Sequence, residues 1–68
     1  MKLTIESEQE TDGRWIVEAT EIPGVMKFGT TREEAIAQAK VLALRVIADR
    51  IENGEQAIDP AEIEFSAV

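Results

Sequence analysis

The chain contains no cysteine, no histidine and no tyrosine, and only three of its 68 side chains are aromatic. Without cysteine it forms no disulfide and no thiolate metal site, and without histidine it has no imidazole ligand. The same absences remove most of the nucleophile and general-base pairs that enzymes use. We therefore expect a protein that is not an enzyme and that needs no cofactor or metal.

Long apolar runs are also missing, and no segment approaches the length of a membrane span. The first six residues, Met1-Lys2-Leu3-Thr4-Ile5-Glu6, alternate apolar and polar side chains and have no signal-peptide core. Together with the lack of cysteine, this pattern predicts a cytoplasmic protein with no targeting segment and no membrane partner.

Positive charge is scarce, because seven basic residues stand against fourteen acidic ones and leave a net charge of -7. Nucleic-acid backbones are bound by clustered lysine and arginine, so we expect no direct nucleic-acid binding. An acidic surface instead attracts a basic partner and speeds the encounter with it. The simpler interpretation is that the charge keeps a small domain soluble.

Three strands are predicted in the first half of the chain. Residues 3–8 and 15–20 alternate apolar and polar side chains. Asp12-Gly13 between them is typical of a type I′ hairpin turn, in which both residues adopt a positive φ. Ile22-Pro23-Gly24 then interrupts the chain, and residues 25–29 form a third strand. The result is a three-stranded antiparallel meander.

A long helix is predicted from Thr31 to about Asn53. Thr31 as the N-cap with Glu34 three residues later is a capping box, and Gly54 suits the position that ends the helix. The main apolar stripe should face the sheet, and it consists of Ala35, Ile36, Ala39, Leu42, Ala43, Val46 and Ile47.

A second group of apolar residues, Val41, Leu44, Ala48 and Ile51, is predicted on the opposite flank of this helix. The helix should be ~33 Å long and a strand only ~20 Å, so the helix should extend beyond the sheet near Ile51. Either a partner or second copy covers this flank, with Phe28 at the sheet edge as a further contact, or a C-terminal segment folds back over it.

Residues 54–61 form a linker with a turn at Asp59-Pro60, and residues 62–68 alternate as a fourth strand. The predicted order is β-β-β-α-β over a single domain, residues 1–68. This is a two-layer α+β fold, an antiparallel meander with one long helix on one face of the sheet.

Carboxylates are the only metal-binding side chains left. Glu6, Glu8 and Glu10 share one face of the first strand and could hold a divalent cation with Glu18 or Glu62. Such a site would make a metal-dependent nuclease the remote alternative. Alternating glutamates on an exposed strand are more commonly a solvated face, which is the interpretation we prefer.

Three motifs follow one another along the chain: Asp12-Gly13-Arg14-Trp15, then Glu21-Ile22-Pro23-Gly24-Val25, then Gly29-Thr30-Thr31-Arg32-Glu33-Glu34-Ala35. Their order and spacing resemble the HicB family, the antitoxins of HicA–HicB toxin–antitoxin pairs, and the resemblance covers essentially the whole chain. It implies a partial ribonuclease-H-like fold, as in the HicB N-terminal domain, without an assembled catalytic carboxylate set.

The resemblance also implies a function. A HicB-like domain would bind a small, basic, RNA-cleaving HicA-like toxin and mask its RNA surface, and it would form a homodimer or larger homo-oligomer. Many HicB proteins continue into a C-terminal DNA-binding domain, but this chain ends at Val68, so operator binding is not expected. The alternative is a stand-alone, self-associating HicB-like regulatory domain without a toxin partner.

Overall fold

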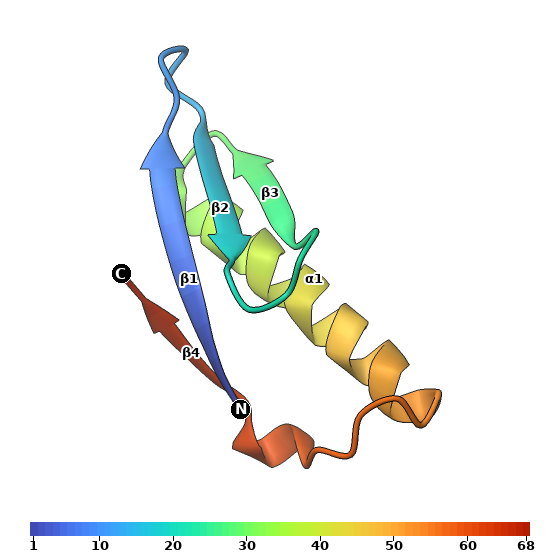
Figure 1. Cartoon of the computed structure of the whole chain (residues 1–68). Coiled ribbons are helices and arrows are strands. Elements are labelled where there is room, and N and C mark those ends of the chain that lie inside the picture. Colours follow the sequence, from blue (N-terminus) through green and yellow to red (C-terminus); the bar gives the residue numbers. More distant parts are fainter.

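The structure is a computed structural model that describes all residues from 1 to 68. Its elements are β1 (Lys2–Gln9), β2 (Trp15–Ala19), β3 (Met26–Gly29), α1 (Arg32–Glu52), a 3-10 turn (Pro60–Glu62) and β4 (Glu64–Ala67). The strands form one sheet in the order β3-β2-β1-β4, and α1 packs on one face of it (Figure 1). The predicted β-β-β-α-β order and the α+β fold class are confirmed. The helix lacks the apolarity that a membrane-spanning segment needs.

The β1–β2 hairpin is antiparallel, with pairs running from Ile5↔Ala19 to Gln9↔Trp15. The predicted type I′ turn is wrong, because only Gly13 has a positive φ, at 92°, and Asp12 does not. The Gly13 amide donates to the Glu10 carbonyl at 3.0 Å, and the Glu10 amide donates to the Arg14 carbonyl at 2.7 Å. Asp12 uses its side chain to accept from the Arg14 amide at 3.0 Å, an Asx-type contact that its ordinary backbone conformation allows.

The fourth strand pairs with β1 in parallel, from Lys2↔Glu64 to Ile5↔Ala67, so the sheet is mixed and β1 lies inside it. This strand is shorter than the predicted residues 62–68. Pro60 favours a helical start through its fixed φ, and the Asp59 carboxylate accepts from the Ala61 amide at 2.9 Å. A single 3-10 turn therefore forms first, and the strand begins at Glu64.

Both predicted ends of α1 are confirmed, with one difference in the cap. The Thr31 hydroxyl accepts from the Glu34 amide at 3.1 Å, but the Glu34 carboxylate accepts from the Thr30 hydroxyl at 3.0 Å and does not return to Thr31. At the other end Gly54 has φ 72°. Its amide donates to the Ile51 carbonyl, and the next amide donates to the Arg50 carbonyl, which is the Schellman arrangement.

The core lies between α1 and the sheet. Three alanines of α1 are fully buried, and because they are small the helix approaches the sheet closely. The approach is close at Gly29, where an added Cβ would lie 2.8 Å from the Ala35 amide nitrogen. The buried apolar residues are Leu3, Ile5, Val17, Ala19, Ile22, Val25, Ala35, Ala39, Ala43 and Ile47.

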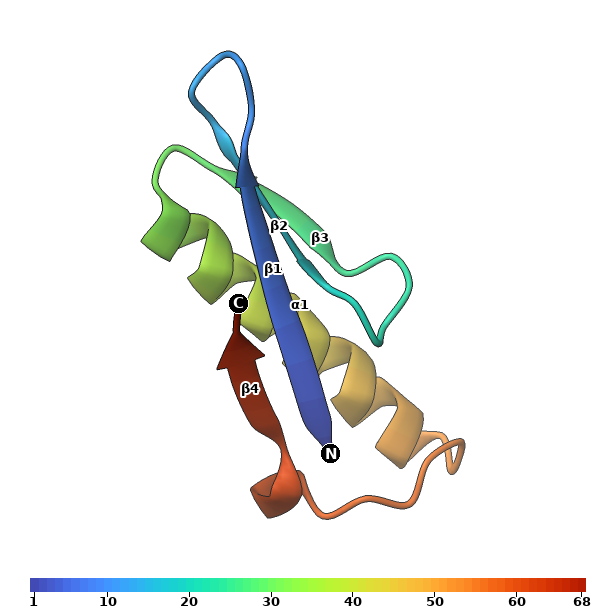
Figure 2. The ribbon, with the colours of Figure 1, turned by 60° about the vertical axis from the view of Figure 1, so that its left-hand side comes forward.

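The predicted helix stripe is confirmed, with three of its large members on the borders. Ile36, Leu42 and Val46 are half-buried and pack against the core, whereas Ile47 is fully buried. The C-terminal turns of α1 extend past β3, but β1 reaches about as far as they do (Figure 1) and Ile51 packs against the core, so the predicted extension of the helix beyond the sheet holds for β3 only. Figure 2, turned by 60°, shows α1 again on one side of the sheet, so the other face is open.

Candidate functional site

The outer flank of α1 carries most of the apolar residues predicted there. Val41 is 49% exposed and Leu44 is 44% exposed, and Ala48 is exposed beside them. Ile51 was predicted on this flank, and the structure contradicts that placement, because Ile51 is half-buried and packs against the core. It follows the buried Ile47 by one helical turn, which places it only ~40° from Ile47 at the border of the inward stripe.

Phe28 does not join the helix flank, because it lies on the other side of the sheet. Lys27 pairs with Val17, whose side chain is buried against α1, and Phe28 pairs with Ile16 on the opposite face. Phe28 is 45% exposed, and the Arg14 guanidinium lies 4.9 Å from the centre of its ring. The five predicted contact residues therefore do not form one surface, because Phe28 lies on the other face of the molecule from the helix flank and Ile51 packs against the core.

The open face of the sheet combines apolar and acidic side chains. Across the strands Glu8 pairs with Ile16, and Ile16 pairs with Phe28. In the next row Glu6 pairs with Glu18, and Glu18 pairs with Met26, which is 47% exposed. A hollow of about 520 Å³ lies here, lined by Glu6, Ser7, Glu8, Ile16, Glu18, Met26 and Val68. We call this surface the open face.

The carboxylates of the open face form no ion pair. The structure holds a single ion pair, between Arg14 and Asp12. Glu6 and Glu18 stand directly opposite each other on adjacent strands, where like charges repel. Their charge is therefore not neutralised within the molecule, and a positively charged group from outside would relieve the repulsion.

No three carboxylates of the chain converge closely enough to share a metal ion. Glu62 belongs to the 3-10 turn before β4, close to Met1, whereas Glu8 and Glu10 lie toward the hairpin turn at the other end of β1. The glutamates named in the remote alternative are therefore not gathered into one group in this structure.

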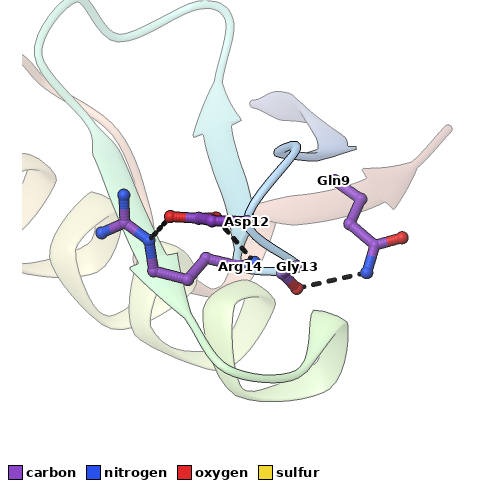
Figure 3. Close-up of polar contacts among 4 residues, drawn as sticks. All are labelled: Gln9, Asp12, Gly13 and Arg14. Carbon is purple, nitrogen blue, oxygen red and sulfur yellow. Dashed lines mark hydrogen bonds and ion pairs between the residues drawn. The ribbon is translucent and has the colours of Figure 1, made fainter.

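The hairpin turn fixes one border of the open face. The Arg14 Nε donates to Asp12 Oδ2 at 2.8 Å, and the Gln9 side chain donates to the Gly13 carbonyl at 3.1 Å (Figure 3). The pKa of Asp12 is lowered, first because the Arg14 amide donates to its carboxylate and then because the Arg14 side chain does. These contacts hold Arg14 where its guanidinium covers the ring of Phe28.

Glu21 ties the loop after β2 to β1. Its carboxylate accepts from the Thr4 amide at 2.7 Å and from the Thr4 hydroxyl at 2.7 Å, and the Thr20 hydroxyl adds a contact at 3.1 Å. The donors stabilise the ionised form, so the pKa of Glu21 lies below its ordinary value of 4.5, with the Thr4 amide as the largest cause.

Acidification is expected to destabilise the fold through Glu21. Because its pKa is lower in the folded state, the unfolded chain takes up a proton first, and stability falls as the pH drops below 4.5 toward the folded pKa. The melting temperature of the wild type should fall more steeply in this window than that of Glu21→Gln. Parallel pH profiles of the two proteins would contradict the role given to this carboxylate.

The residues of the open face were only partly recognisable in the sequence. Ile16 is the one large apolar side chain that breaks the alternation of residues 15–20, and Met26 and Phe28 repeat that outward pattern on the next strand. Val68 joins them only because β4 runs beside β1. The strand register brings these four apolar residues to one face, and the sequence pattern alone does not predict that register.

Comparisons with known proteins were made at the level of family models, curated proteins and solved structures, and none of them gave a match. The resemblance to HicB antitoxins thus rests on the three sequence motifs alone.

Proposed function

We propose that the open face binds a basic protein and masks the surface it covers, so that the chain acts as a binding module and not as a catalyst. The observation that carries the proposal is the hollow in which three carboxylates without an ion pair surround Ile16 and Met26. Apolar contact in the centre with charge around it is the usual composition of a protein interface. The net charge of -7 would speed the encounter with a positively charged partner.

The partner class we propose is a small basic toxin that cleaves RNA, as in HicA–HicB pairs. A protein that holds RNA needs clustered lysine and arginine for the phosphates. The carboxylates of Glu6, Glu8 and Glu18 would compete for those same groups and keep RNA away from them. The HicB-like order of motifs supports this choice of partner over other basic proteins.

A second function is favoured by the outer flank of α1. Val41 and Leu44 are both close to half exposed, with Ala48 beside them, and nothing in the chain covers them. An exposed apolar group of this kind is typical of a contact between subunits. On this alternative the chain is a self-associating regulatory domain without a toxin.

Light scattering after size exclusion separates these two functions. The chain is run alone and then with a HicA-like protein encoded in the same genome, and RNA cleavage by that protein is assayed with and without the chain. A mixed complex with suppressed cleavage supports toxin masking. A homo-oligomer that ignores the toxin-like protein supports the alternative.

Neutralising the open face is expected to weaken the complex. Glu6→Gln with Glu18→Gln removes two charges that oppose each other within the sheet, so the fold should be kept. The Kd for the basic partner should rise about tenfold, mainly through slower association at low salt. Glu52→Gln with Glu55→Gln is the matched control, because both residues are exposed at the end of α1. An equal rise in Kd for both pairs would mean that net charge and not the open face drives binding.

A further inference from the structure

The free edge of β3 offers unpaired backbone groups. In an antiparallel pair the residues alternate between facing the partner strand and facing away from it. The Ala19 amide donates to the Val25 carbonyl at 3.1 Å. By this alternation the backbone N–H and C=O groups of Lys27 and Gly29 also point toward β2. The N–H and C=O groups of Met26 and Phe28 therefore point away from the sheet, and β3 is an edge strand with no neighbour on that side.

A groove lies between this edge and α1. It has a volume of about 340 Å³ and is lined by Lys27, Ala37, Gln38, Val41, Leu42 and Arg45. Val41 and Leu42 make part of its wall apolar, and neither Lys27 nor Arg45 is in an ion pair. The protein has twice as many acidic as basic residues, but the lining of this groove contains two basic residues and no acidic one. The groove is therefore positively charged on an acidic protein.

A second copy of the chain fits this edge poorly. In the register centred on Lys27, which pairs the most of β3, a two-fold axis sets Met26 of each copy against Phe28 of the other and the two Lys27 residues directly opposite each other. Their Cα atoms would then be roughly 4.5 Å apart, and like charges at that position destabilise a sheet. The two unpaired cations of the groove suit a negatively charged occupant.

We propose that the β3 edge and this groove bind an extended acidic segment of a partner protein as a fifth strand of the sheet. The backbone groups of Met26 and Phe28 hydrogen-bond to the segment, as in other cases of strand addition. The side chains of the segment that point toward α1 place carboxylates at Lys27 and Arg45 and apolar groups on Val41 and Leu42. This surface carries the opposite charge to the open face, so the two proposals stand or fall separately.

The test uses two synthetic heptapeptides with blocked ends. In both, threonine fills every second position, and the three positions between, which share one face of the strand, are glutamate, valine and glutamate in one peptide and lysine, valine and lysine in the other. Each is titrated into the isotopically labelled full chain, and the Kd and the hydrogen exchange of each amide are measured. The glutamate peptide should bind about tenfold more tightly and should protect the amides of Met26 and Phe28. The net charge of the chain favours the lysine peptide, so preference for glutamate would have to come from the groove.

Two charge reversals locate the binding. Arg45→Glu should raise the Kd of the glutamate peptide about tenfold, while Lys2→Glu, the same change on β1, should leave it within about twofold. Equal losses in both variants, tighter binding of the lysine peptide at this edge, or no binding at roughly 1 mM peptide would each overturn the proposal. A dimer of the free chain with Met26 and Phe28 amides already protected would overturn it too, because a second copy would then occupy the edge.

Discussion

Replacing Ile47 with aspartate is expected to unfold the domain. Ile47 is 1% exposed and packs among the core residues of α1 and the sheet, with no polar group nearby to pair with a carboxylate. Burying an unpaired charge costs several kcal/mol, whereas a domain of this size has roughly 3 to 10 kcal/mol of stability in all. Circular dichroism should show that Ile47→Asp is already unfolded at room temperature and has no cooperative transition on heating.

Leu44→Asp is the matched control for this substitution. It lies three residues earlier in the same helix and carries a helix-propensity cost at least as large as that of Ile47→Asp, up to about 0.7 kcal/mol, but its side chain is 44% exposed. This variant should remain folded with a melting temperature close to that of the wild type. If Ile47→Asp also remained folded, the packing of α1 on the sheet would be incorrect.

Gly29→Ala is expected to be the most damaging single-methyl addition in the chain. The new Cβ would lie 2.8 Å from the Ala35 amide nitrogen and 3.0 Å from the Ala35 Cα. Both atoms are backbone, so no side-chain rotation relieves the clash, and the start of α1 has to move away from β3. The free energy of unfolding should fall by about 1–3 kcal/mol. Each kcal/mol lowers the melting temperature of a domain of this size by several degrees. Thermal and urea unfolding of the variant measure it.

A double substitution shows which atoms limit the approach at Gly29. Ala35→Gly removes the Cβ that also lies 3.0 Å away but leaves the amide nitrogen in place. Adding Ala35→Gly to Gly29→Ala should therefore restore little of the lost stability. Full recovery in the double variant would contradict the close backbone contact and assign the clash to the Ala35 methyl group.

The features predicted correctly from the sequence are the ones that depend on neighbouring residues. The N-cap at Thr31 and the αL residue at Gly54 are specified within a few positions of each helix end. The stripe that buries Ala39 and Ala43 follows from the helical repeat alone. The turn at Asp12-Gly13 was located correctly, but its type was wrong because the Asp12 side chain, not its backbone, completes it.

The features that the sequence did not predict depend on contacts between distant segments. The parallel pairing of β4 with β1 joins residues at opposite ends of the chain, and no local pattern encodes that direction. The open face exists because Ile16 and Met26 meet across two strands, which needs the register of the sheet. The groove beside β3 likewise depends on where α1 crosses the sheet. Lys27 and Arg45 are far apart in the sequence, so the sequence did not predict that they line one groove.

The position of β4 beside β1 has a consequence for the order in which the fold is completed. Residues 2–5 are synthesised well before their partners, residues 64–67, so one side of β1 stays without a neighbour until those later residues have emerged. Closing so long a loop carries a large entropic cost, and the contact should form late. Until then the edge of β1 is a template for pairing with other chains, and Lys2, Glu6 and Glu8 along it act as gatekeepers against aggregation.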